Sequence, residues 1–191
     1  STIDPTTENF PDSQARQSEY YKRYYESQQW WFARMRTGSF SIQEKLTLFW
    51  HSFLCSDFLK VYTPQYLVVQ NQLFRANAWG NIKTIIRALV ADPAMLIYLD
   101  NVVSIKGNPN ENFARELLEL FTLGVNNYSE TDIVEAARAL TGWRIKNLRG
   151  EFYPEYWDNT SKTFMGKSGA LNADDIVNTI FEKDACALYF A

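Results

Sequence analysis

The stretch NPNENFARELLELFTLG, residues 108–124, has the spacing of an amphipathic helix with both of its ends marked. Asn110 suits the start of the helix, because a side-chain oxygen there can accept hydrogen bonds from free backbone amides. Gly124 suits the left-handed position that follows a helix end. At about 3.6 residues per turn the apolar residues fall on one side: Phe113, Leu117, Leu120 and Phe121. The stretch therefore predicts a helix that packs one side against a core.

The other side of this predicted helix carries an arc of polar side chains about 140° wide: Glu111, Asn112, Arg115, Glu116 and Glu119. A solvated helix face is the simplest interpretation of this spacing. The arc can also form a structural ion-pair network around Arg115, with these partners: Asn110, Glu111, Glu116 and Glu119. In a third interpretation the arc faces inward, and its glutamates are free for metal binding or acid–base chemistry. Burial of these side chains decides between the interpretations.

His51 is the only histidine in the sequence, so any mechanism with a histidine base or ligand must use it. It lies on the polar side of a helix predicted over residues 42–56, with Cys55 within reach one turn later. One His and one Cys are half of a zinc site. A hydrogen-bonded structural histidine is therefore the favoured interpretation. The sequence lacks the signature motifs of serine hydrolases, zinc proteases and nucleotide-binding enzymes.

Aromatic residues recur at helical spacing in a long helix predicted over residues 13–35: Tyr20, Tyr21, Tyr24, Tyr25, Trp30 and Trp31. An ordinary packing face is the favoured interpretation, because aromatic side chains contribute the largest burial energies. A ladder of exposed rings can instead bind glycans by stacking. Exposure of Trp30 or Trp31 would favour the glycan-binding interpretation.

Start signals predict further helices along the chain. Ser41 can cap the helix over residues 42–56, with Glu44 reaching back to the backbone amide of the cap. The expected core side of that helix is Ile42, Leu46, Phe49, Trp50 and Phe53. Thr63 before Pro64 predicts another helix start by the same logic. Caps and prolines give the remaining helices, over residues 64–78, 82–90, from 93, 130–141, 173–182 and from 184.

The helical periodicity is lost between residues 144 and 167, where short extended pieces predict irregular structure or a small β-hairpin. Residues 1–12 have the character of a flexible tail. No repeat and no linker-like composition divides the rest of the chain. The sequence therefore predicts a mainly α fold with one multi-helix globular domain over residues 13–191.

The composition excludes several classes of protein. The 191 residues are 46% hydrophobic, which is enough for a substantial core. A formal net charge of -3 offers no basic surface for nucleic acid. No apolar run reaches the roughly 20 residues that span a bilayer, and the first residues lack the features of a signal peptide. Cys55 and Cys186 could form a bridge or stay free thiols.

Several stretches occur in an order typical of one family: QEKLTLFWH, QNQLFR, DPAMLIYLDN, NPNENFARELLELFTLG, AARALTGW and KTFMGKSG. In these stretches the chain resembles the bacterial family catalogued as domain of unknown function 1800, from about Trp31 to its last residue. The resemblance implies an exported, extracytoplasmic protein that is longer than this chain, of which the given sequence would be the central part. It also implies a partner, either the flanking parts of the same chain or a second exported protein related to sulfatases.

The chain departs from the family pattern at two places. Family members often read FWHGHF where this chain has FWHSF, so Phe53 stands in place of a second histidine. They often read His-Asp where this chain has Trp157 and Asp158. If those histidines bind metal in relatives, this chain keeps only His51.

Three functions follow as expectations. The first is a helical module that acts by binding or assembly, with the ion-pair network around Arg115. The second is a metal-assisted hydrolase with a divalent metal as its cofactor; its candidate catalytic residues are His51, Glu116 and Asp158, and its candidate metal ligands are His51, Glu111, Glu116 and Glu119. That enzyme needs His51 and at least two carboxylates to converge on a cleft. The third is a glycan-binding module that uses the aromatic stripe over residues 20–31.

Overall fold

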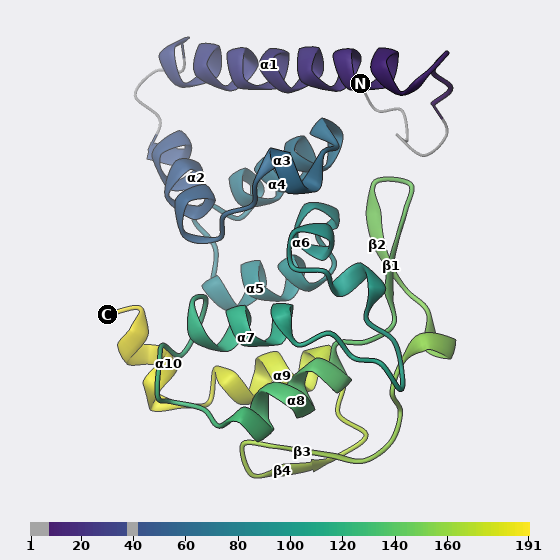
Figure 1. The fold of residues 1–191 in the computed structure, drawn as a ribbon. Helices are drawn as coiled ribbons and strands as arrows, with labels where there is room; N and C mark the ends of the chain where they lie inside the picture. Colours follow the sequence, from purple (N-terminus) through teal and green to yellow (C-terminus); the bar gives the residue numbers. More distant parts are fainter. Residues whose placement is uncertain (1–7, 38–41) are drawn as a thin grey trace.

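A computed structural model describes residues 8–37 and 42–191 of the protein. Within these ranges the chain forms ten α-helices and two antiparallel sheets of two strands each. One long helix lies across one end of the molecule, and the shorter helices follow below it in layers (Figure 1). The mainly α fold class expected from the sequence is confirmed.

The long helix is α1, Ser13–Thr37, which is close to the predicted span. Residues 1–7 of the expected tail lie outside the described residues. The rest of that tail is held against α1: Glu8 accepts hydrogen bonds of 2.7 and 2.8 Å from Arg23, and the ring of Phe10 meets that of Tyr20 at 5.8 Å. This short segment is therefore packed rather than free.

The helix α2, Ile42–Phe53, buries the predicted core side only in part: Trp50 belongs to the core and Phe53 packs against it. Its buried residues are Glu44, Thr47 and Trp50, whereas Ile42 and Phe49 are 51% and 54% exposed. The reason is that Glu44 binds an arginine of α4, Pro64–Ala76, which turns this row of α2 toward α4. The predicted cap Ser41 lies outside the described residues.

Two of the three helices that the sequence predicts next after α2 begin with a side-chain cap. A short helix that was not predicted, α3, spans Phe58–Val61. Asn81 caps α5, Ile82–Val90, and Asp92 caps α6, Pro93–Tyr98, each through its side chain. At the start of α4, Pro64 occupies the first turn, but the side chain of Thr63 makes no capping hydrogen bond. The proline alone marks that helix start.

The stretch NPNENFARELLELFTLG, residues 108–124, contains the helix α7, Asn112–Glu119. Its neighbour α8, Glu130–Ala139, starts with a capping box in which Ser129 and Asp132 satisfy each other's backbone amides. Phe113, Leu117 and Phe121 are buried as expected, but Leu120 is 51% exposed. The main core lies among α5, α7, α8 and α9, Ala173–Ile180.

Two hairpins replace the single irregular segment expected near residues 144–167. The first pairs β1, Trp143–Lys146, with β2, Arg149–Phe152, and the second pairs β3, Lys162–Phe164, with β4, Lys167–Gly169. Their turn residues have positive φ angles, which reverse the chain within two residues: Asn147, Leu148, Met165 and Gly166. The chain ends with α10, Asp184–Tyr189.

Two further expectations concern the thiols and membranes. Both cysteines are free, with Cys55 exposed and Cys186 buried, so they do not form the bridge that the sequence left open. In the described ranges, every helix is too short or too polar to cross a bilayer.

Candidate functional site

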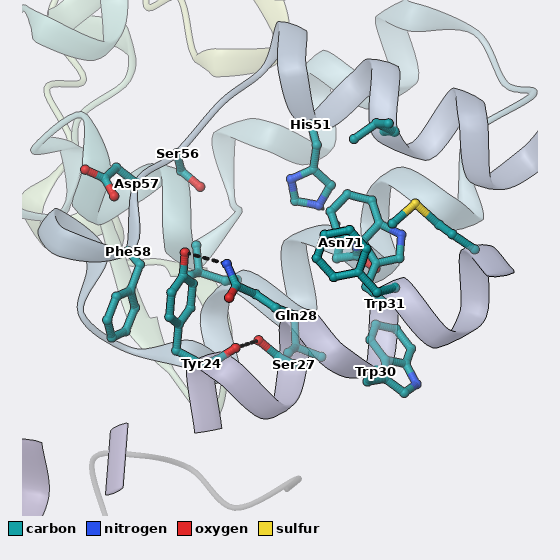
Figure 2. Close-up of a pocket in the computed structure, with 15 residues that line it drawn as sticks. Tyr24, Ser27, Gln28, Trp30, Trp31, His51, Ser56, Asp57, Phe58 and Asn71 are labelled. Carbon is teal, nitrogen blue, oxygen red and sulfur yellow. Dashed lines mark hydrogen bonds between the residues drawn. The ribbon is translucent and has the colours of Figure 1, made fainter. Parts of the chain in front are cut away.

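A pocket of about 350 Å³ lies between α1, α2, the start of α3, and α4 (Figure 2). Nearly half of its lining residues come from α1, around the end of the predicted aromatic stripe. Its aromatic lining consists of Tyr24, Trp30, Trp31, Phe32, His51 and Phe58. Its other polar lining consists of Ser27, Gln28, Ser56, Asp57 and Asn71.

The aromatic stripe divides into a packing part and an exposed part. The ring of Tyr24 stacks on that of Phe58 with centroids 4.1 Å apart and an angle of 5° between the planes. Tyr20 is buried, and Tyr21 packs edge-on against Phe58. Trp30, by contrast, is 40% exposed. Tyr20, Tyr21 and Tyr24 therefore fix α1 to the body of the protein, whereas Trp30 and Trp31 line the pocket.

The polar groups of the pocket are held by hydrogen bonds. Gln28 donates to the hydroxyl of Tyr24 at 2.9 Å, a bond that Figure 2 shows as a dashed line. Ser56 donates to Gln70 at 2.6 Å, and Asp57 accepts the backbone amide of Leu59 at 3.0 Å. Of the pocket-lining residues that the structure describes, only Asp57 is a carboxylate, and lysine and arginine do not occur among them.

A buried ion pair lies next to Trp30 and Trp31, the two tryptophans that line the pocket. The guanidinium of Arg75 donates two hydrogen bonds to the carboxylate of Glu44, at 2.8 and 2.9 Å, and both side chains are 9% exposed. Arg34 and the indole nitrogen of Trp31 donate to the same carboxylate at 2.8 and 3.0 Å. The bond from Arg75 is the largest cause that lowers the pKa of Glu44 to about 2, against the effect of burial. Glu44 therefore stays ionised and joins α1, α2 and α4.

His51 ends a chain of contacts that begins at this ion pair. Arg75 donates to Oδ1 of Asn71 at 2.5 Å, and Nδ2 of Asn71 lies 3.0 Å from Nε2 of His51. The imidazole packs against the ring of Trp31 with centroids 4.7 Å apart. Burial, together with the positive charge of Arg75, lowers the pKa of His51 to about 4. The histidine is therefore neutral at physiological pH.

A buried carboxyl group lies on the far side of Ser56. Gln70 accepts from Ser56 and donates to Oδ2 of Asp92 at 2.8 Å, and Asp92 also accepts the backbone amide of Met95 at 2.8 Å. Oδ1 of Asp92 is buried and finds no hydrogen-bond partner within the described ranges. Burial raises the pKa of Asp92 to about 7, and the hydrogen bonds oppose this shift only in part.

The predicted arc on α7 lies at the surface. Arg115 pairs with Glu130 at 3.0 Å and with Glu111 at 3.5 Å, and all three side chains are at least 37% exposed. Glu130 belongs to α8 and was not part of the predicted network. Such exposed pairs contribute little to stability, because water and salt screen them.

Three other predicted members of that network make no hydrogen bond or ion pair with Arg115 within the described ranges. Glu119 accepts a hydrogen bond of 2.7 Å from Tyr128, and Asn110 accepts the backbone amide of Asn112 at 2.9 Å. Glu116 lines a separate pocket with Cys55, and burial, followed by the charge of Glu119, raises its pKa. The predicted network is therefore corrected in its membership: Arg115 joins Glu111 and Glu130, and not Glu116 or Glu119.

Asp158 is engaged in a third polar cluster. It accepts hydrogen bonds from Arg138 at 2.8 Å and from the backbone amide of Thr160 at 3.0 Å, and its own carbonyl accepts from the buried Lys162. Burial alone would raise its pKa, but the bonds from Thr160 and Arg138 outweigh burial and lower the pKa to about 2. These contacts connect α8 to the segment between the two hairpins.

The structure does not bring the candidate metal ligands together. His51 lies in the pocket beside α1, Glu116 lines a different pocket, and Asp158 binds Arg138. Across residues 8–37 and 42–191, His, Cys, Asp and Glu side chains form no group of three or more that could hold a metal ion. The convergence of His51 with two carboxylates, which the hydrolase interpretation requires, is absent from these ranges.

Sequence reasoning missed Arg75 and Asn71. They stand four residues apart in the stretch QNQLFR and therefore share one face of α4, which was the available signal. Glu44 was assigned to a cap because its partner lies 31 positions away, beyond the reach of any local pattern.

These features define a mainly helical protein with an aromatic-walled pocket beside a buried ion pair. Residues 2–191 match the family described as Protein of unknown function (DUF1800), and the chain belongs to this family. No curated protein and no solved structure matches the chain.

Proposed function

We propose that the chain is a binding module of an extracytoplasmic bacterial protein, and that the pocket between α1 and α4 takes a carbohydrate unit. The observation that carries this proposal is the 40% exposure of Trp30 in a pocket that is otherwise lined by aromatic rings and small polar groups. This exposure is what the glycan-binding interpretation of the stripe required.

The size of the pocket suits a small ligand. Its volume of about 350 Å³ is near the lower end of the roughly 300–1,000 Å³ typical of small-molecule sites. A pocket of this size accommodates one or two sugar rings, and a longer glycan would continue into solvent past Phe32, which is 67% exposed. A terminal or side-branch sugar fits this shape better than the middle of a chain.

The chemistry of the lining suits an uncharged, hydroxylated ligand. A sugar ring has apolar C–H faces that pack on aromatic rings, and hydroxyl groups that both donate and accept hydrogen bonds. Gln28, Ser56 and Asn71 offer amide and hydroxyl partners of both kinds. An anionic ligand is disfavoured, because Asp57 is the charged member of the described lining residues.

The other two functions have weaker support. For the hydrolase, the candidate carboxylates Glu116 and Asp158 do not share the pocket of His51. For assembly through α7, the ion pairs of Arg115 already join α7 to α8 within the chain. The extracytoplasmic setting and an exported, sulfatase-related partner remain part of the proposal through the family resemblance.

The proposal is tested by calorimetric titration of the protein with cello-, xylo-, malto- and chito-oligosaccharides. We expect at least one series to bind, and Trp30→Ala to weaken that binding about tenfold, since burying an aromatic face contributes about 1.5 kcal/mol. Circular dichroism checks that the variant is folded, because Trp30 also lies under the guanidinium of Arg75 at 5.2 Å.

Tyr25→Ala is the matched control. Tyr25 is on the same helix and is 58% exposed, but it does not line the pocket. Its replacement should leave the affinity unchanged. Absence of binding in all four series, or equal losses for the two variants, would refute the proposal.

A further inference from the structure

The orientation of the Asn71 side chain is determined by its arginine neighbour. A guanidinium can only donate hydrogen bonds, so the atom of Asn71 that receives Nη1 of Arg75 at 2.5 Å is the amide oxygen. The amide nitrogen of Asn71 must then face His51, at 3.0 Å from Nε2. Glu44 holds the guanidinium in place with two hydrogen bonds, so the amide has no freedom to turn over.

This orientation determines which nitrogen of His51 carries the proton. An amide nitrogen can only donate, so Nε2 of His51 must accept and cannot be protonated. The neutral imidazole therefore carries its hydrogen on Nδ1. The chain from Glu44 through Arg75 and Asn71 thus selects one of the two tautomers of His51.

The Nδ1 atom is left for a ligand. Within the described part of the chain it has no hydrogen-bond partner, and it is not among the polar atoms that are both buried and unpaired. In Figure 2 the ring points from α2 into the space between Ser56 and Trp31. The rings of Trp31 and Phe74 pack against the imidazole, with centroids 4.7 and 4.9 Å away, and restrict its rotation.

We propose that His51 is a fixed hydrogen-bond donor, locked as the Nδ1–H tautomer, that binds an acceptor oxygen of the ligand in the pocket. This inference rests on the proposed function for the identity of the ligand, but the tautomer does not depend on it. Asp57 lines the same pocket and its carboxylate is a hydrogen-bond acceptor, so the site offers a donor at His51 and an acceptor at Asp57. A ring oxygen or a hydroxyl oxygen of the ligand can accept the hydrogen bond from His51, whereas an ammonium group cannot, because it only donates.

The charged groups around the imidazole favour this neutral form. Arg75 approaches it from α4 through Asn71, and Glu44 of α2 is already neutralised by Arg75 and by Arg34 of α1. Asp57 lines the same pocket ahead of α3. Glu44, the one carboxylate in this chain of contacts, therefore does not stabilise an imidazolium directly.

Nitrogen NMR of the free protein tests the tautomer directly, because the chain contains a single histidine. At pH 7 we expect one imidazole with Nδ1 protonated and Nε2 unprotonated. A protonated Nε2, or two tautomers in comparable amounts, would overturn the inference whatever the pocket binds.

The variant Asn71→Asp should reverse the tautomer of His51. A carboxylate at this position accepts instead of donating, so the proton should move to Nε2, and the pKa of His51 should rise. Asn71→Ser is the second variant if the aspartate does not fold, since its hydroxyl releases the constraint and should give a mixture of tautomers. An unchanged Nδ1–H spectrum in the folded variants would show that Asn71 does not select the tautomer.

Titration with the oligosaccharide found by calorimetry tests the contact with the ligand. We expect the Nδ1 proton to shift on addition of the sugar, and His51→Phe to weaken binding by up to about tenfold. A correct tautomer in a protein that binds no sugar would refute only the proposed function. Binding that leaves both the Nδ1 proton and the affinity of His51→Phe unchanged would refute the role of His51.

Discussion

The guanidinium of Arg75 and the carboxylate of Glu44 meet through two parallel hydrogen bonds of 2.8 and 2.9 Å, in a place where both side chains are 9% exposed. Paired geometry of this kind is the strongest form of charge-assisted hydrogen bond in proteins. It connects α2 with α4 and, through Trp31 and Arg34, holds α1 as well. The ion pair therefore holds together the helices that form the pocket, α1, α2 and α4.

Glu44→Gln should lower the free energy of unfolding by about 3–5 kcal/mol, because it leaves the buried guanidinium of Arg75 without its counter-charge. Urea unfolding followed by circular dichroism measures the loss. Glu130→Gln is the control, since it removes an exposed partner of Arg115 and should change stability little. Equal effects of the two changes would contradict the structural importance of the buried pair.

Acid should destabilise the protein through His51. Its pKa is lowered to about 4 in the folded state, against an ordinary value of 6.5, so the unfolded chain binds the proton first as the pH falls. The stability contributed by the neutral imidazole is complete above pH 6.5 and is lost between about pH 6.5 and 4, by up to about 3 kcal/mol.

His51→Gln isolates this contribution, because the amide oxygen of glutamine can still accept from Asn71 but does not titrate. The difference in unfolding free energy between wild type and variant should narrow or reverse as the pH falls through this range. A difference that is independent of pH would contradict a neutral, buried His51.

Asp92 should change the stability of the protein with pH in the opposite direction to His51. Its pKa is raised to about 7 against an ordinary value of 3.8, so the unfolded chain loses the proton first as the pH rises. The folded protein then loses stability between about pH 4 and 7, and no further above pH 7. Asp92→Asn keeps an oxygen for the cap of α6 and removes the ionisation.

Chemical unfolding at closely spaced pH values measures this effect. Wild type should become less stable relative to Asp92→Asn as the pH rises to 7, and the difference should then stay constant. If wild type instead became less stable relative to Asp92→Asn as the pH falls, Asp92 would be ionised in the folded protein.

Asp158→Ala should lower the free energy of unfolding by about 1–3 kcal/mol, because Arg138 and the backbone amide of Thr160 lose their acceptor. Thermal unfolding measures the loss. Glu155→Ala is the control, since Glu155 is exposed in the same segment. Stability equal to that of the control would remove the structural role of Asp158 and return it to the list of catalytic candidates.

Local signals in the sequence predicted most of the helices. Gly124 has the expected positive φ angle, but α7 ends at Glu119, before the end that was predicted beside this glycine. Ser129 and Asn172 each form a side-chain cap at the start of a predicted helix. These features depend on residues within one turn, so a linear pattern contains all of the information. The same reasoning failed at Thr63, where the proline was sufficient without a side-chain cap.

The candidate site could be predicted only in part. The aromatic stripe was found because its residues repeat along one helix, and His51 was found because it is unique. The partners of Glu44 come from α1 and α4, and they could not be found because periodicity reports which face a residue lies on, not what packs there. The buried side of α2 was predicted correctly at Trp50 but not at Ile42 and Phe49, because the ion pair of Glu44 turns a polar row of the helix toward α4.

Nearly half of the residues that line the pocket belong to α1 alone. A ligand in the pocket should therefore stabilise the packing of α1 on the rest of the protein, and the packed α1 should in turn favour binding of the ligand. A ligand at about a hundred times its dissociation constant would stabilise the docked helix by roughly 2.7 kcal/mol. The backbone amides of α1 should accordingly exchange with deuterium far more slowly in the complex than in the free protein. The bound ligand would thus hold in place the helix that covers it.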